Sequence, residues 1–149
     1  MTGLESREAL NAGRISFYGN DLLLNLYEQL SNDYPESVFF LKNDYSFTEL
    51  YAEIKKAADS DLLNKRVVLG FDRSLNLGPE ELHSLEEILK DHEVFLFVSY
   101  DLEEAGSFRL FSFAKMIEEG NYLLADKLHL SSEGNIAAYQ KISEELKPQ

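Results

Sequence analysis

Hydrophobic residues in this chain gather in short continuous runs, and the runs alternate with segments where hydrophobic residues recur every three or four positions. Four of the runs predict β-strands, near residues 14–18, 37–41, 66–71 and 93–99. These strands are apolar almost throughout, which is typical of a sheet that is covered on both faces. The pattern therefore predicts parallel strands that are buried between helices.

The segments between the runs carry leucines, isoleucines and aromatic residues at helical spacing. Ser46-Phe47-Thr48-Glu49 is a capping box that starts one helix, and a proline at a favoured first-turn position starts another. A proline preceded by a tyrosine ends the first helix, because the residue before proline disfavours helical backbone. Five helices are expected. The first contains Leu22 to Leu30, the second begins at Ser46 and the third at Pro79. The fourth spans 108–119, and the last begins at Ser131 or Ser132.

Strands that alternate with helices predict right-handed crossovers between parallel strands. We expect the four strands in the order second, first, third, fourth, within a three-layer α/β/α sandwich of flavodoxin-like order. The length of 149 residues suits one domain. Residues 1–13 are interpreted as a flexible lead-in or linker, and residues 14–149 as a single α/β domain.

Composition and charge exclude several classes of function. Hydrophobic residues make up 44% of the chain, which is a globular composition. A net charge of −13 argues against binding to nucleic acid and against electrostatic binding to anionic lipid. The chain has no cysteine, so disulfides and thiolate chemistry are excluded. No apolar run approaches the length of a spanning helix, so we expect neither a signal peptide nor direct membrane insertion in this chain.

Polar residues follow each predicted strand, at the edge of a parallel sheet where ligands bind. These turns read Gly19-Asn20-Asp21, Lys42-Asn43-Asp44, Gly70-Phe71-Asp72 and Ser99-Tyr100-Asp101. Aspartate and asparagine also cap helices and form turns, and this reading suits Asp44 and Asp101 best. The loop before the last helix adds Asp126 and His129.

Asp126-Lys127-Leu128-His129, followed by Ser131-Ser132-Glu133-Gly134, resembles the Asp-x-x-His block of the SGNH hydrolase superfamily. Over residues 14–147 the chain is most similar to the C-terminal domain of bacterial cell-wall O-acetyltransferases of the peptidoglycan type. The resemblance implies an SGNH-like fold. It also implies a relation to enzymes that transfer or hydrolyse acyl groups on cell-wall carbohydrate. An extracytoplasmic location is favoured if the chain is a fragment of a membrane acyltransferase.

The other family blocks depart from the pattern. The first block is Gly-Asp-Ser in the family, and Asp21 stands here at the nucleophile position. The second block supplies an oxyanion-hole glycine, where this chain has Lys42-Asn43-Asp44. The third block is Gly-x-Asn, and Asp72 replaces its asparagine. The resemblance assigns the catalytic positions to Asp126, His129 and Asp21, and the oxyanion or binding positions to Gly19, Asn20, Asn43, Gly70 and Asp72.

These substitutions predict an impaired enzyme, or pseudoenzyme, in an acidic domain. An ionised aspartate at position 72 has no proton to donate to an oxyanion. The position of Asp21 offers no hydroxyl nucleophile. We expect no cofactor and no resident metal.

Four alternatives stay open. Asp21 could itself be the nucleophile, with His129 activating water. Asp21, Asp72 and His129 could bind a divalent metal, since carboxylates and imidazole are suitable ligands. Ser16 or Ser74 could serve as a displaced nucleophile. The domain could also be a non-catalytic module that binds a cell-wall glycan or a partner protein.

Overall fold

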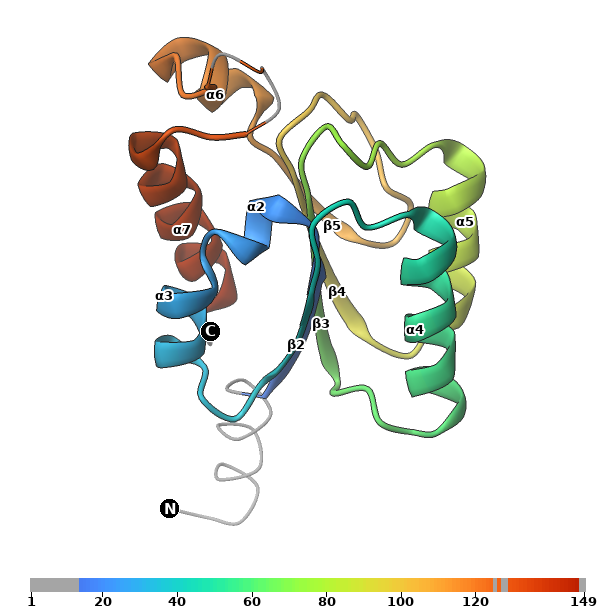
Figure 1. Ribbon diagram of the computed structural model, residues 1–149. Helices are drawn as coiled ribbons and strands as arrows, with labels where there is room; N and C mark the ends of the chain where they lie inside the picture. Colours follow the sequence, from blue (N-terminus) through green and yellow to red (C-terminus); the bar gives the residue numbers. More distant parts are fainter. Residues whose placement is uncertain (1–13, 125, 127–128, 148–149) are drawn as a thin grey trace.

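The structure, a computed structural model, describes residues 14–124, 126 and 129–147 (Figure 1). The predicted lead-in, residues 1–13, lies outside the described residues. A five-stranded sheet in the order β2-β1-β3-β4-β5 forms the middle layer, and all its neighbouring strands are parallel. The strands are β1 (Ile15–Gly19), β2 (Val38–Leu41), β3 (Arg66–Phe71), β4 (Glu93–Val98) and β5 (Arg109–Ser112).

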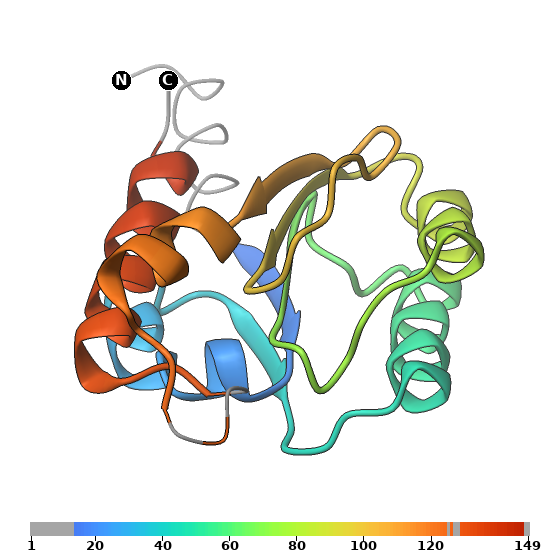
Figure 2. The ribbon, with the colours of Figure 1, turned by 90° about the horizontal axis from the view of Figure 1, so that it is seen from above.

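Helices cover both faces of the sheet, as Figures 1 and 2 show. One face carries α4 and α5, and the opposite face carries α2, α3, α6 and α7. The helices are α2 (Asp21–Leu24), α3 (Tyr27–Asp33), α4 (Phe47–Asp59), α5 (Pro79–Ile88), α6 (Ala114–Gly120) and α7 (Ser132–Leu146). The predicted three-layer sandwich and the predicted order of the first four strands are confirmed.

The core consists of two apolar layers, one on each side of the sheet. Successive residues of a strand point to opposite faces, so Val67 and Leu69 of β3 pack with α4 and α5, whereas Val68 packs with the helices of the other face. All three side chains are fully buried. The continuous apolar runs of β1, β3 and β4 therefore have a direct cause in the two covered faces.

Local signals place the helix starts as expected. The Ser46 hydroxyl accepts a hydrogen bond from the Glu49 amide at 3.1 Å, which caps α4. Pro79 occupies the first turn of α5. The Ser131 hydroxyl accepts from the Gly134 amide at 3.1 Å, so Ser131, of the two candidate serines, caps α7. Each cap satisfies an amide that has no partner within its helix.

Two expected helices differ from the structure. Residues 108–119 do not form one helix, because Arg109–Ser112 pairs with β4 as the edge strand β5 and only Ala114–Gly120 is helical. Phe111 of this strand stacks on Phe97 of β4 with ring centroids 5.2 Å apart, a contact that its helical spacing did not reveal. The helix after β1 is divided into α2 and α3, because the Leu26 amide donates to the Leu23 carbonyl only three residues back.

The second strand is also less buried than its apolar run predicted. Among the described residues, β2 is the other edge of the sheet and pairs with β1 alone. Its side chains alternate between exposed and half-buried, and Val38 and Phe40 are 42% and 39% exposed. An apolar run therefore marks a strand without showing whether it lies inside the sheet or at its edge. Within the described ranges, the helices are too short or too polar to cross a membrane.

Candidate functional site

Two glycines at the carboxyl ends of β1 and β3 bring the first helix against the sheet. Gly19 and Gly70 face each other in the strand register. A Cβ atom on Gly19 would lie 2.6 Å from the Gly70 carbonyl oxygen, and one on Gly70 would lie 2.5 Å from Cγ of Leu23. Only glycine leaves room here for α2. The close approach places Asp21, the first residue of α2, beside the residue that follows β3.

Asn20 joins the two strand ends through its side chain. Its Oδ1 accepts from the amide of Leu22 at 3.2 Å, which caps α2, and from the amide of Asp72 at 2.9 Å, which ties the residue after β3 to the start of α2. Its Nδ2 donates to Oδ1 of Asp72 at 3.0 Å. Asn20 is fully buried. The two turns are therefore one hydrogen-bonded unit.

Asp72 is held by three donors on one of its two carboxylate oxygens. Besides Asn20, the amide and the hydroxyl of Ser74 donate to Oδ1 at 2.9 Å and 2.6 Å. The other oxygen, Oδ2, is buried and has no hydrogen-bond partner in the part of the chain that the structure describes. Asp72 is 1% exposed. The bonds on Oδ1 fix the direction in which Oδ2 points.

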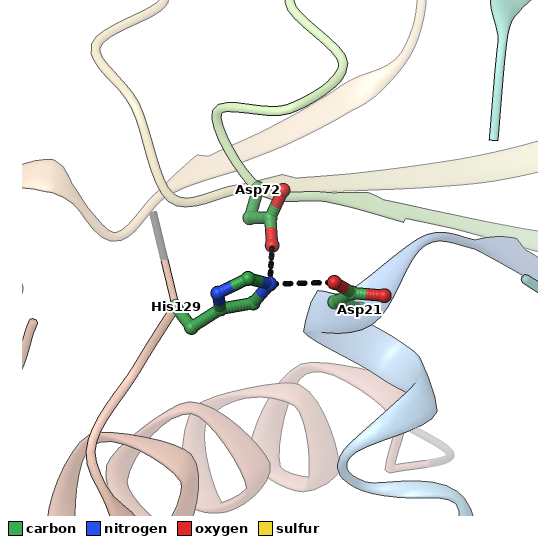
Figure 3. Close-up of side chains that lie close together, drawn as sticks. All are labelled: Asp21, Asp72 and His129. Atoms are coloured by element: carbon green, nitrogen blue, oxygen red, sulfur yellow. Dashed lines mark hydrogen bonds and ion pairs between the residues drawn. The ribbon is translucent and has the colours of Figure 1, made fainter. Parts of the chain in front are cut away.

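The loop between α6 and α7 brings His129 across to this unit. The Leu124 amide donates to the His129 carbonyl at 2.8 Å. Asp126 contacts His129 twice: its Oδ1 accepts from the backbone amide at 3.1 Å, and its Oδ2 lies 2.6 Å from Nδ1 of the imidazole. The other ring nitrogen, Nε2, lies 2.5 Å from Oδ2 of Asp21 and 4.0 Å from Oδ2 of Asp72 (Figure 3).

Three aspartates thus surround one imidazole. The hydrogen bonds that Asp126 and Asp21 accept from the ring raise the pKa of His129 from 6.5 to about 9. At neutral pH the ring is therefore an imidazolium whose two N–H groups donate to Asp126 and Asp21. An imidazolium has no free lone pair, so in this state His129 cannot accept a proton from a nucleophile.

The remaining residues assigned by resemblance lie differently. Gly19 and Gly70 act in packing, as described above, and Asn20 acts as a cap and a link. Asn43 is exposed in the turn after β2, and its side chain makes no hydrogen bond to another described residue. The structure brings Asp21, Asp72, Asp126 and His129 together. The roles that the resemblance assigns to them stay predictions.

The two serines considered as displaced nucleophiles are both committed to other contacts. The Ser16 hydroxyl accepts from the Asn64 amide at 3.0 Å and is buried within β1. The Ser74 hydroxyl is bound to Asp72. Sequence reasoning missed this supporting role of Ser74, although its position two residues after an aspartate is the spacing of a local side-chain turn.

A depression of about 490 Å³ adjoins the site, and sequence reasoning also missed it. Arg73, which directly follows Asp72, lines it together with a residue of the loop after β4 and residues of α6 and the loop after α6. Its lining is Arg73, Asp101, Ala114, Lys115, Ile117, Glu118, Asn121 and Leu123. The lining carries charges of both signs, so it suits a polar ligand better than an apolar one.

The site also holds a set of possible metal ligands. One oxygen each of Asp21 and Asp72 and one ring nitrogen of His129 lie within 4.8 Å of one another. Two carboxylates and one imidazole are ligand types that divalent transition metals accept.

No protein-family model matches the chain, and no curated protein matches its sequence. Solved structures do resemble it. The C-terminal catalytic domain of peptidoglycan O-acetyltransferase A from Streptococcus pneumoniae is 13% identical with a TM-score of 0.64, over 87% of this chain and 90% of that one. A GDSL-like lipase from Bacteroides thetaiotaomicron is 9% identical with a TM-score of 0.67, over 95% and 94%.

A third similar structure is a two-domain esterase active on acetylated mannans. It is 13% identical with a TM-score of 0.56, over 96% of this chain, which spans 52% of that protein. At these identities the likeness is one of fold. The chain therefore has an SGNH-hydrolase-like fold, as the resemblance in the sequence predicted.

Proposed function

We propose that this chain is an SGNH-like domain related to cell-wall carbohydrate O-acetyltransferases and esterases, and that it does not transfer acyl groups through a hydroxyl nucleophile. One observation carries the proposal. The group that meets Nε2 of His129 is the carboxylate of Asp21, at 2.5 Å. This is where the nucleophilic hydroxyl of an acyl-transfer triad would be hydrogen-bonded to its base.

The charge state of His129 supports the same proposal. In a serine triad the neutral imidazole accepts the proton of the hydroxyl. Here Asp126 and Asp21 raise the pKa of His129 to about 9, so Nε2 carries its own proton at neutral pH. The pair of Asp21 and His129 is then an ion pair in which Nε2 cannot accept a proton from a hydroxyl nucleophile.

The oxyanion side supports it as well. Acyl transfer develops negative charge on the substrate oxygen, and an enzyme stabilises this charge with N–H or O–H donors. An ionised Asp72 offers an acceptor there, and Asp21 adds a second negative charge close by. Both charges would repel a developing oxyanion.

The test is ester hydrolysis by the purified domain, with p-nitrophenyl acetate as substrate. We expect the wild type and His129→Ala to hydrolyse the ester at the same slow rate. The matched control is His83→Ala, which removes an exposed histidine paired with Glu87 on α5. Wild-type turnover that falls in His129→Ala but not in His83→Ala would refute the proposal, and Asp21 would then be examined as the nucleophile.

The depression beside Asp72 supports a second candidate function, a module that binds carbohydrate or protein. Arg73, Lys115 and Asn121 offer hydrogen-bond donors in its lining. The solved relatives include proteins named for peptidoglycan and for acetylated mannans. Addition of soluble peptidoglycan fragments should shift amide resonances of α6 and of residues 73–74 in NMR spectra. Shifts that survive in Arg73→Ala, or none at all, would refute this assignment of the surface.

A further inference from the structure

We infer that Asp21, Asp72 and His129 form a binding site for one divalent transition-metal ion, with Asp126 as the residue that orients the imidazole ligand. This goes beyond the proposed function, because a metal site requires neither a nucleophile nor an acyl substrate. The ligands come from three separate turns: the start of α2, the end of β3 and the loop before α7 (Figure 3). The fold, and not a local motif, brings them together.

The distances suit an ion placed between the three ligand atoms. Metal–ligand bonds of about 2.1 Å at tetrahedral angles separate two ligand atoms by about 3.4 Å. In the metal-free arrangement, Nε2 of His129 lies 2.5 Å from Asp21 and 4.0 Å from Asp72. The first of these separations has to widen and the second to contract, each by less than about 1 Å. The carboxylate oxygens of Asp21 and Asp72 lie within 4.8 Å of each other, so they have to approach by at most about 1.4 Å. The His129 side chain is 32% exposed, so it lies on a loop surface that an ion can reach.

Asp72 supplies an independent reason to expect a ligand. Its side chain is only 2% exposed, and its Oδ2 lacks a hydrogen-bond partner among the described residues while it points toward His129 (Figure 3). A buried carboxylate oxygen without a donor is costly. Three donors on Oδ1 prevent the group from turning to a better partner. Oδ1 of Asp21 is likewise buried without a partner in this part of the structure.

The contact between Asp126 and His129 is what a metal-bound histidine requires. A ligating imidazole usually donates its second N–H to a carboxylate, which fixes the ring and its tautomer. Asp126 lies 2.6 Å from Nδ1 and leaves Nε2 toward the cluster. Three protein ligands leave a coordination position open for water or for another group. Metal binding at Nε2 releases the proton that this nitrogen carries at neutral pH. The two carboxylates beside the resulting neutral imidazole leave a net negative charge that a dication compensates.

Isothermal titration of the metal-free protein with ZnCl₂ at neutral pH tests the inference. The wild type should bind one Zn²⁺ per chain. Asp72→Asn and His129→Ala each remove one ligand and should abolish this one-to-one binding. Asp126→Ala leaves all three ligands and should weaken it by about 10- to 100-fold, because it releases the orientation of the ring. NMR spectra of Mn²⁺-treated protein should show paramagnetic line broadening that is strongest at the amides of residues 21, 72 and 129.

His83→Ala is the matched control. His83 and Glu87 are four residues apart on α5 and could bind zinc weakly at the surface. The substitution should leave the one-to-one binding unchanged. The inference is wrong if the wild type shows no saturable binding, or if binding persists in Asp72→Asn and His129→Ala. It is also wrong if binding is lost in His83→Ala. Since the readout is binding, none of these results depends on whether the domain hydrolyses esters.

Discussion

The two sides of the site are built in opposite ways. The base half, Asp126 and His129, lies on the loop before α7, and its side chains are 45% and 32% exposed. The carboxylate half, Asp21 and Asp72, lies where β1 and β3 end, and its side chains are 15% and 2% exposed. In sequence, Asp126 and His129 of the base half resemble the Asp-x-x-His block of SGNH hydrolases. Asp21 and Asp72 of the carboxylate half differ from the corresponding blocks of that superfamily.

The contacts of the two halves show what this difference means. The imidazole of the base half contacts Asp126 through Nδ1 and Asp21 through Nε2. The carboxylate half is part of the core, because Asn20 and Ser74 bind Asp72 and the glycine pair sets the position of Asp21. We therefore expect substitutions in the carboxylate half to change chemistry and stability, and substitutions in the base half to change mainly charge.

The largest effect is expected from Asp21→Ser combined with Asp72→Asn. Asp21→Ser places a hydroxyl beside His129, and Asp72→Asn places an amide donor at the position that the resemblance assigns to the oxyanion hole. It also removes one carboxylate that charges the imidazole. The double variant should hydrolyse p-nitrophenyl acetate at least about 10²-fold faster than the wild type, since one oxyanion donor alone is worth that much. Rates of the wild type, both single variants and the double variant measure it.

Each single variant should gain less than the double, because nucleophile and donor act as a unit. Adding His129→Ala to the double variant is the control, and it should remove the gain. A double variant that is folded and still as slow as the wild type would show that Asp21 and Asp72 alone do not account for the slow ester hydrolysis. The turn with Asn43, which lacks the oxyanion glycine of the family, would then be the next difference to restore.

The second effect is on stability. Asn20→Ala removes the cap of α2 and two hydrogen bonds to Asp72, so it leaves buried polar groups without partners. It should lower the free energy of unfolding by roughly 2 kcal/mol. Asp126→Ala, in the exposed base half, should lower it by less than about 1 kcal/mol. Urea unfolding curves compare the two. Equal losses of unfolding free energy would contradict the conclusion that the carboxylate half is part of the core and the base half lies at the surface.

The sequence predicted much of this architecture because its signals are local. Continuous apolar runs, the capping box at Ser46 and the proline at 79 depend on neighbours in the chain, and the elements they predicted are present. The order of strands followed from general rules of parallel sheets. The contact between Asp21 and His129, across 108 positions of sequence, was expected from the order of the family blocks.

What the sequence did not reveal depends on partners that are distant in sequence. The edge strand β5 forms because Phe111 meets Phe97, and a helical spacing of residues 108–119 could not indicate this. The exposure of β2 depends on which strand lies beside it. The charge of His129 depends on two carboxylates, Asp126 in its own loop and Asp21 at the start of α2. Their residue types were visible in the sequence, but the distances that set the pKa were not.

The third effect is on the pKa of His129 in metal-free protein. The hydrogen bonds that Asp126 and Asp21 accept from the ring hold this pKa at about 9 in the wild type. Asp126→Ala and Asp21→Asn should each lower it toward 6.5, since each removes a partner of the charged ring. NMR detection of the imidazole nitrogens during a pH titration measures it. A wild-type value near 6.5 would mean that the two halves meet without forming an ion pair.

The smallest effect is the pH dependence of stability that this pKa implies. The folded pKa of His129 is raised to about 9 from its ordinary 6.5, so the folded state binds the proton more tightly than the unfolded chain does. The resulting stabilisation is fully present below pH 6.5 and is lost as the pH rises toward 9. The ring is partly exposed, so the change in the free energy of unfolding should stay below about 1 kcal/mol.

Urea unfolding of the wild type and of His129→Ala, across this pH range and without metal, isolates the contribution of His129, because all other groups titrate in both proteins. The difference between the two curves should shrink as the pH rises. A difference that stays constant from pH 6.5 to 9 would show that the charge on His129 does not hold the loop of the base half to the buried carboxylates.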